Sequence, residues 1–155
     1  MKINDRIFGE LEYDYMWFKD VEIDFFGKKV EIVLSIDGEE NAKFDNKQYE
    51  AYNLLIENWN EIQNKIVKSI LDYYKEKRSE LGYDITFNEK YKLIETFQEL
   101  MNNITLVGIN IPYGECFDGL GVGITFDCTW DKENGVGVQL VDGNVILVGY
   151  QDITM

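Results

Sequence analysis

Two short segments near the N-terminus place carboxylates and apolar side chains in strict alternation. Residues 10–15 read ELEYDY and residues 20–25 read DVEIDF. Successive side chains of a β-strand point to opposite faces, so each segment predicts a strand with one apolar face and one acidic face. Other elements must then cover the apolar face, while the acidic face is left in solvent.

The charge balance of the whole chain is strongly acidic. Its 155 residues include 29 Asp and Glu against 15 Lys and Arg, and the net charge is −14 at pH 7. Nucleic acids and anionic membranes repel such a surface, so we expect neither as a partner. The charge favours a basic protein or a cation as the partner, or else a purely solubilising role.

The chain contains no histidine. This removes the Ser-His and Cys-His nucleophile pairs, the commonest general base near neutral pH, and the usual ligand of zinc, copper and non-haem iron. Cys116 and Cys128 form no CxxC motif, and we expect both to be buried thiols in a reducing compartment. We therefore predict no catalytic residue, no cofactor and no metal site.

The N-terminal residues MKINDR lack the apolar run of a signal peptide. No stretch approaches the ~18 apolar residues that a membrane span requires. We therefore expect a cytoplasmic protein.

The order of the predicted elements indicates one α+β domain over residues 1–155. Alternation predicts three antiparallel strands within residues 8–37 and further strands from residue 105 onward. Apolar residues at three- and four-residue steps predict a long helix over about 46–80 and a second helix over about 87–103. The capping residues expected at the two helix starts are Asp45 with Gln48, supported by Phe44 packing on Tyr49, and Thr86 with Glu89.

Glycine-containing dipeptides predict the turns between strands. They are Gly27-Lys28 in the N-terminal strands, then Asn134-Gly135 and Asp142-Gly143, which make the last three strands an antiparallel meander. With Gly27-Lys28 as a two-residue turn, Asp24 lies opposite Glu31. Like charges opposite each other across a ladder are destabilising.

Two further segments resemble ligand sites but have a simpler structural explanation. Residues 119–123, GLGVG, lack the following helix and lysine of a phosphate loop, so their glycines predict a bend or close backbone approach in a sheet. Asp127, Asp131 and Glu133 are candidates for a cation site, but their spacing does not fit a calcium loop and favours turn chemistry. Trp130 is in phase with the apolar residues before it, which predicts that it closes the core.

The acidic strand faces are the candidate partner-binding site. A chain selected for stability alone would place lysines opposite these carboxylates, and the alternative is that exposed, salt-screened repulsion is too small to matter. We call these residues the acidic face; they are Glu10, Glu12, Asp20, Glu22, Asp24 and Glu31.

Two segments resemble a known family over nearly the full chain. One is FGELEY at residues 8–13, followed by a Trp and the VEI…FGK hairpin. The other is the tail from Gly123 to Val138, which closes with Asp142-Gly143 and Val148-Gly149. The chain is similar to a family of small bacterial domains of unknown function, whose members resemble, by genomic setting, immunity proteins of polymorphic or contact-dependent toxin systems. The family's tail motif matches here at Trp130, Asp131, Glu133, Gly135, Gly137 and Val138, with Asn134 where many relatives carry His. The resemblance transfers no catalytic residue and favours toxin neutralisation.

Three functions remain open. The first is a non-enzymatic immunity-type protein that binds and neutralises a basic toxin domain, for example a nuclease, because complementary charge speeds the encounter. The second is a housekeeping or structural homodimer, and the third is a hydrolase that uses a pair of carboxylates. The product of the gene immediately upstream, tested for complex formation at low salt, discriminates the first from the others.

Overall fold

The computed structural model describes residues 1–41, 43–82 and 89–154. Within these residues the chain forms an eight-stranded sheet in which each strand neighbours the next along the sequence. The α+β class and the single domain are confirmed. The strands are β1 (Lys2–Asp5), β2 (Gly9–Tyr13), β3 (Trp17–Phe25), β4 (Lys28–Ile36), β5 (Ile104–Ile111), β6 (Gly121–Cys128), β7 (Val136–Val141) and β8 (Asn144–Gly149).

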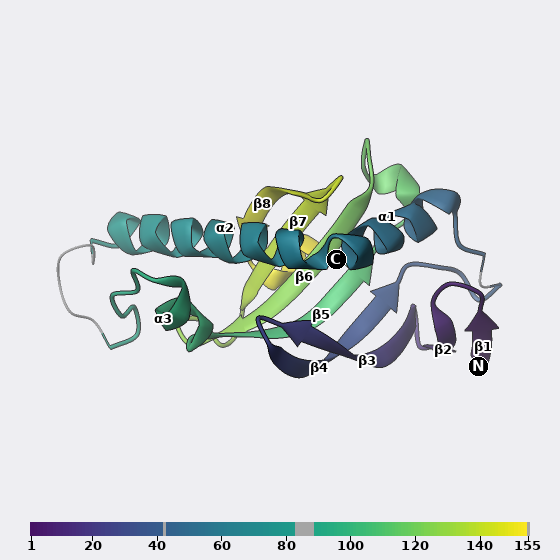
Figure 1. Ribbon diagram of the computed structural model, residues 1–155, viewed down its shortest axis with the longest axis horizontal. Helices are drawn as coiled ribbons and strands as arrows, with labels where there is room; N and C mark the ends of the chain where they lie inside the picture. Colours follow the sequence, from purple (N-terminus) through teal and green to yellow (C-terminus); the bar gives the residue numbers. More distant parts are fainter. Residues whose placement is uncertain (42, 83–88, 155) are drawn as a thin grey trace.

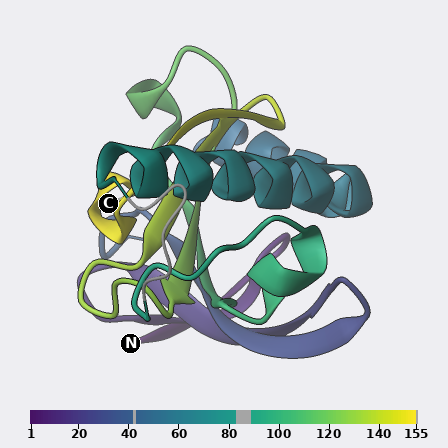
Figure 2. The same cartoon turned by 90° about the vertical axis from the view of Figure 1, so that its left-hand side faces the viewer.

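Strand pairs are antiparallel throughout the described residues except β4 with β5, which run parallel. A parallel pair needs a long crossover. Here the crossover contains the helices α1 (Asn46–Glu57), α2 (Trp59–Glu80) and α3 (Phe97–Met101). Helices α1 and α2 run almost end to end across one face of the sheet (Figure 1), and Figure 2 shows α3 next to α2. We call the face beneath the helices the inner face and the opposite one the outer face.

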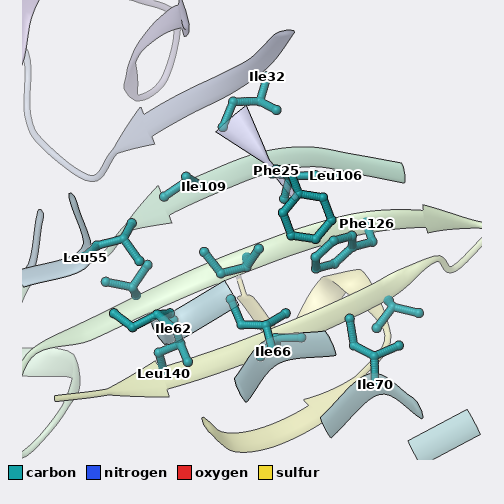
Figure 3. Packing of buried hydrophobic residues seen from close by; sticks show 14 of the residues in the cluster. Phe25, Ile32, Leu55, Ile62, Ile66, Ile70, Leu106, Ile109, Phe126 and Leu140 are labelled. Carbon is teal, nitrogen blue, oxygen red and sulfur yellow. The ribbon is translucent and has the colours of Figure 1, made fainter. Parts of the chain in front are cut away.

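The core lies between the helices and the inner face. Figure 3 shows Ile62, Ile66 and Ile70 of α2 directed toward Phe126 and Leu140 of the sheet, and all five are buried. Burying each such side chain contributes about 1.5–3 kcal/mol. The apolar stripe predicted for the long helix is therefore the core-facing side of α2.

Trp130 is confirmed as a core residue. Its side chain is 1 % exposed, and its ring centroid lies 4.5 Å from that of Tyr74 on α2. Burial is the main cause that raises the pKa of Tyr74 to about 12, against a smaller lowering by Arg78. The loop after β6 is thus anchored to the C-terminal half of α2.

The helix predicted over 46–80 is two helices with a break at Asn58. The Asp45 capping box with Gln48 is present, and the rings of Phe44 and Tyr49 lie 6.2 Å apart, which confirms the predicted start. At the break, Trp59 donates an indole hydrogen bond of 2.6 Å to the carbonyl of Asp24 in the β3–β4 hairpin. The apolar period continues through Asn58, so the break leaves no trace in the sequence pattern.

The prediction of a helix over 87–103 is wrong for most of its described residues. Residues 87 and 88 lie outside the described part of the chain, and of the rest only Phe97–Met101 is helical, while residues 89–96 are irregular. Two side chains of α2 use backbone carbonyls that a helix would need. Tyr74 donates to the carbonyl of Lys92 at 2.5 Å, and Arg78 donates to that of Tyr91 at 2.8 Å. The cap of the short helix is Thr96 with Glu99, while Thr86, the predicted cap, lies outside the described residues.

The N-terminal strands differ from the prediction in two places. The short strand β1 was not predicted. The strand predicted over residues 10–15 instead ends at Tyr13, because Tyr15 has φ 66° and is 93 % exposed. Trp17 then begins β3 in the core.

The β3–β4 turn is Phe26-Gly27 and not Gly27-Lys28. Both residues have positive φ, 52° and 84°, as a type I′ hairpin turn requires. The prediction that Asp24 faces Glu31 is therefore wrong. Asp24 pairs with Lys29, and Glu31 pairs with Glu22.

The C-terminal meander is confirmed, and its two turns differ. Asp142-Gly143 forms the predicted two-residue turn with φ values of 53° and 80°. Asn134-Gly135 instead ends a longer loop that runs from Thr129 between β6 and β7.

Candidate functional site

The structure brings all six residues of the predicted acidic face onto the outer face of the sheet. Glu10 and Glu12 lie on β2, and Glu31 lies on β4, with the other three on the intervening strand β3. All six are exposed. The alternation that defined the face in the sequence thus becomes one continuous surface across three neighbouring strands.

Two lysines share this surface and form weak ion pairs with it. Lys2 Nζ lies 3.4 Å from Glu12 and 4.0 Å from Glu10, and Lys29 Nζ lies 3.6 Å from Glu22. All of these side chains are more than half exposed, and such pairs contribute about 0–1 kcal/mol each. The lysines leave the surface with a net negative charge.

The remaining carboxylates of the acidic face are not equivalent. Asp24 accepts a hydrogen bond of 2.9 Å from the Gly27 amide and so takes part in the hairpin turn. Asp20 and Glu31 form no ion pair within the described part of the chain. Asp20 pairs across the ladder with Val33, an apolar residue that is 43 % exposed on the same face.

Part of the other half of the outer face, over β6 and β7, is covered by the C-terminal segment. The 3₁₀ helix η2 (Gln151–Thr154) packs on β6 and β7. Gly123 makes this possible, because a Cβ there would lie 2.7 Å from the Thr154 Cβ, and a Cβ at Gly137 would collide with the Tyr150 carbonyl. The close backbone approach predicted from the GLGVG glycines is confirmed at Gly123.

Residues 130–138, which carry part of the family resemblance, help to hold the C-terminal segment on the sheet. Gly135 has φ 59° and packs against Gln151, whose backbone amide donates 2.9 Å to the Asn134 carbonyl. The Gln151 side chain donates 2.6 Å to the carbonyl of Phe126. The motif from Trp130 to Val138 therefore has a structural role in the core and in docking the chain end.

The turn function predicted for Asp131 is confirmed. Its carboxylate accepts hydrogen bonds from the Asn134 amide at 3.2 Å and from the Asn134 side chain at 3.0 Å. Burial raises its pKa, but the Asn134 hydrogen bonds and the charges of Lys90 and Lys77 outweigh burial, and the pKa lies below its usual value. Asp127 accepts instead from Gln151. Within the described residues no group of acidic or cysteine side chains is arranged to hold a metal ion.

A small cleft on the outer face was not predicted from the sequence. It lies between the ends of β4 and β5 and the C-terminal segment, has a volume of about 120 Å³, and we call it the Asp37 cleft. Its lining includes Asp37, Asn110, Cys116, Phe117, Gln139 and Thr154.

Asp37 is the ionisable group of this cleft. Burial raises the pKa of its carboxyl group, and a hydrogen bond from the Tyr113 backbone offsets part of that rise. Asp37 follows Glu31, Val33 and Ser35, the outer-face residues of β4, at the same two-residue spacing. That spacing is the one sequence signal that places Asp37 on the outer face. Cys116 at the rim is exposed, so its predicted burial is wrong, whereas Cys128 is buried as predicted.

No helix within the described residues is long and apolar enough to cross a membrane. No curated protein and no solved structure matches the chain. The model of one family, described as Domain of unknown function (DUF6985), matches residues 7–155. The chain therefore belongs to the DUF6985 family of domains of unknown function.

Proposed function

We propose that this protein is a non-enzymatic, immunity-type binding protein whose acidic face docks on a basic protein partner. The partner that fits the sequence resemblance is a toxin domain such as a nuclease, which the protein neutralises by covering its basic surface. The observation that carries the proposal is the acidic face itself: six exposed carboxylates on β2, β3 and β4, with Glu22 directly opposite Glu31.

The physical basis is complementary charge. A nuclease binds a polyanion and so presents a positive surface, which a negative sheet face matches. Such complementarity raises the association rate more than it raises the final affinity, and salt screens it. Val33 adds an exposed apolar group among the carboxylates, which suits the mixed polar and apolar composition of protein interfaces.

The test is binding of the product of the gene immediately upstream, measured by surface plasmon resonance at low and high salt. The double variant Asp20→Lys, Glu31→Lys reverses the two acidic-face carboxylates that form neither an ion pair nor a turn hydrogen bond in the described structure. We expect its association rate to fall by about tenfold or more at low salt.

The matched control is Glu50→Lys, Glu57→Lys, which makes the same charge change at exposed positions of α1 in the helical layer. It should retain most of the association rate. Equal losses in the two double variants would mean that only net charge matters. An absent complex at low salt would contradict the proposal altogether.

Self-association is a second candidate, supported by a different surface. Strand β8 is an edge of the sheet, and its residues Ile146 and Leu147 are 54 % and 48 % exposed. An exposed apolar edge strand can pair with another copy. Light scattering of the parent and of Leu147→Lys tests this: a dimer that the substitution converts to monomer supports the homodimer, and a monomeric parent contradicts it.

A further inference from the structure

The Asp37 cleft contains a carboxylate without a cationic partner. No lysine or arginine nitrogen lies within 4.0 Å of Asp37 in the described residues, and residues 42, 83–88 and 155 include neither residue type. The nearby Ser35 hydroxyl donates to Asn110 at 2.9 Å and not to Asp37. A partly desolvated carboxylate gains from a cation placed beside it.

The other polar groups of the cleft are held in place by the C-terminal segment. The Asn110 amide group donates 3.1 Å to the Thr154 carbonyl, and the Gln139 amide group donates to the carbonyl of Ile153. One N–H of each amide group is thereby used inside the protein. The carbonyl oxygen of Gln139 has no hydrogen-bond partner among the described residues, so it is an available acceptor.

The shape and lining of the cleft limit what can enter it. Holding one water requires about 10–15 Å³, so a volume of about 120 Å³ has room for a group of several heavy atoms. Phe117, Pro112 and Ile153 supply an apolar wall beside the carboxylate. Lysine and arginine combine these two requirements, since an apolar stem carries a cationic end.

We propose that the Asp37 cleft binds an organic cation, an ammonium or guanidinium group on a short apolar stem. Asp37 is the counter-ion, Gln139 accepts a hydrogen bond from the cation, and Phe117 packs on the stem. The group comes either from a lysine or arginine of a docked protein or from a free small amine. The inference does not depend on the toxin partner, because the cleft lies beyond the acidic face and can be tested alone.

The test is a titration of the full chain followed by NMR, with the side-chain amide signals of Asn110 and Gln139 as reporters. The probes are agmatine and cadaverine as free amines, and Nα-acetyl-arginine amide and Nα-acetyl-lysine amide as models of protein side chains. We expect saturable shifts of both reporters. Stronger binding of the blocked amino acids identifies a protein side chain as the source, and stronger binding of agmatine or cadaverine identifies a free amine.

Two controls make the result specific to Asp37. Asp37→Asn should weaken binding by about tenfold or more, because it removes a charge-assisted hydrogen bond. Glu57→Gln, which removes an exposed carboxylate of α1 outside the acidic face, should leave binding unchanged. Nα-acetyl-norleucine amide, a neutral probe, should not shift the reporter signals of the parent protein. This comparison uses only the parent protein, so its outcome does not depend on the folding of a variant. Absent shifts, or equal shifts with the neutral probe or in both variants, would overturn the proposal.

Discussion

Glu22 on β3 lies directly opposite Glu31 on β4 in the antiparallel ladder of the outer face. Lys29, two residues before Glu31, reaches diagonally across and places its Nζ 3.6 Å from Glu22. The protein therefore keeps a like-charge pair at the centre of the acidic face and compensates it with one exposed lysine.

We expect Glu31→Lys to raise the free energy of unfolding by about 0.2–1 kcal/mol, because it turns a repulsive cross-strand pair into an attractive one. The same substitution should weaken binding of a basic partner at low salt. Urea denaturation measures the first effect and surface plasmon resonance the second. Asp24→Lys is the contrasting variant: it loses the Lys29 pairing and the Gly27 hydrogen bond, so it should destabilise the protein.

The faces of the N-terminal strands could be predicted although their register could not. The true register differs from the predicted one by two residues, and side chains alternate with period two. Each acidic-face carboxylate of β3 and β4 therefore lies on the predicted face of the sheet, but opposite a different residue from the predicted one. The turn is also contacted by Gln63 of α2, whose side-chain oxygen accepts a hydrogen bond of 3.1 Å from the Phe26 amide. Local sequence does not reveal that contact.

Phe26 adopts a left-handed conformation that disfavours a bulky side chain and suits asparagine. We expect Phe26→Asn to stabilise the protein by up to about 1 kcal/mol. The substitution relieves backbone strain at residue 26, and this gain outweighs the lost contact between the partly exposed Phe26 ring and Phe25. Thermal unfolding provides the measurement. Substantial destabilisation would show that the ring contact dominates.

Trp130→Ala should lower the free energy of unfolding by about 3–5 kcal/mol, because it empties a fully buried site against Tyr74. Urea denaturation monitored by circular dichroism measures this loss. Trp130→Phe, which keeps an aromatic ring, should lose less. A Trp130→Ala variant that melts like the parent yet fails to bind its partner would make Trp130 a recognition residue.

The acidic face could be predicted from the sequence, whereas the Asp37 cleft could not. Each residue of the acidic face is defined by strand alternation, which is a local property. The Asp37 cleft instead depends on the C-terminal segment crossing β6 and β7, far from Asp37 in the chain. Gly123 was recognisable as a place of close backbone approach, but Gly137 and the segment that approaches both glycines were not.

Gly137→Ala should destabilise the protein by about 1–3 kcal/mol, because the added methyl group collides with the backbone of Tyr150 and with Ile153. Hydrogen exchange should accelerate at the Gln151 amide, which bonds the Asn134 carbonyl in the parent. Gly149→Ala is the matched control. Its methyl group meets only the side chain of Ile153 at 3.3 Å, so its effect should be smaller. Equal effects would argue against tight docking at Gly137.

The raised pKa of Asp37 predicts a stability difference that depends on pH. Because the folded-state pKa lies above the unfolded value, the folded protein holds this proton more tightly. Tighter proton binding by Asp37 raises the free energy of unfolding. This contribution is complete below the pKa of Asp37 in the unfolded chain, about 3.9, and is lost as the pH rises through its pKa in the folded protein. Asp37→Asn removes the buried charge, so we expect the variant to be more stable than the parent at pH 7.

This advantage should shrink toward zero as the pH falls below about 4, where Asp37 is protonated in both states. Thermal melts of parent and variant across this range measure the difference. Asp20→Asn, at an exposed position, corrects for the general loss of one negative charge and should not show the same gain. An Asp37→Asn variant less stable than the parent at pH 7 would show that the hydrogen bond from the Tyr113 backbone outweighs the burial of the charge.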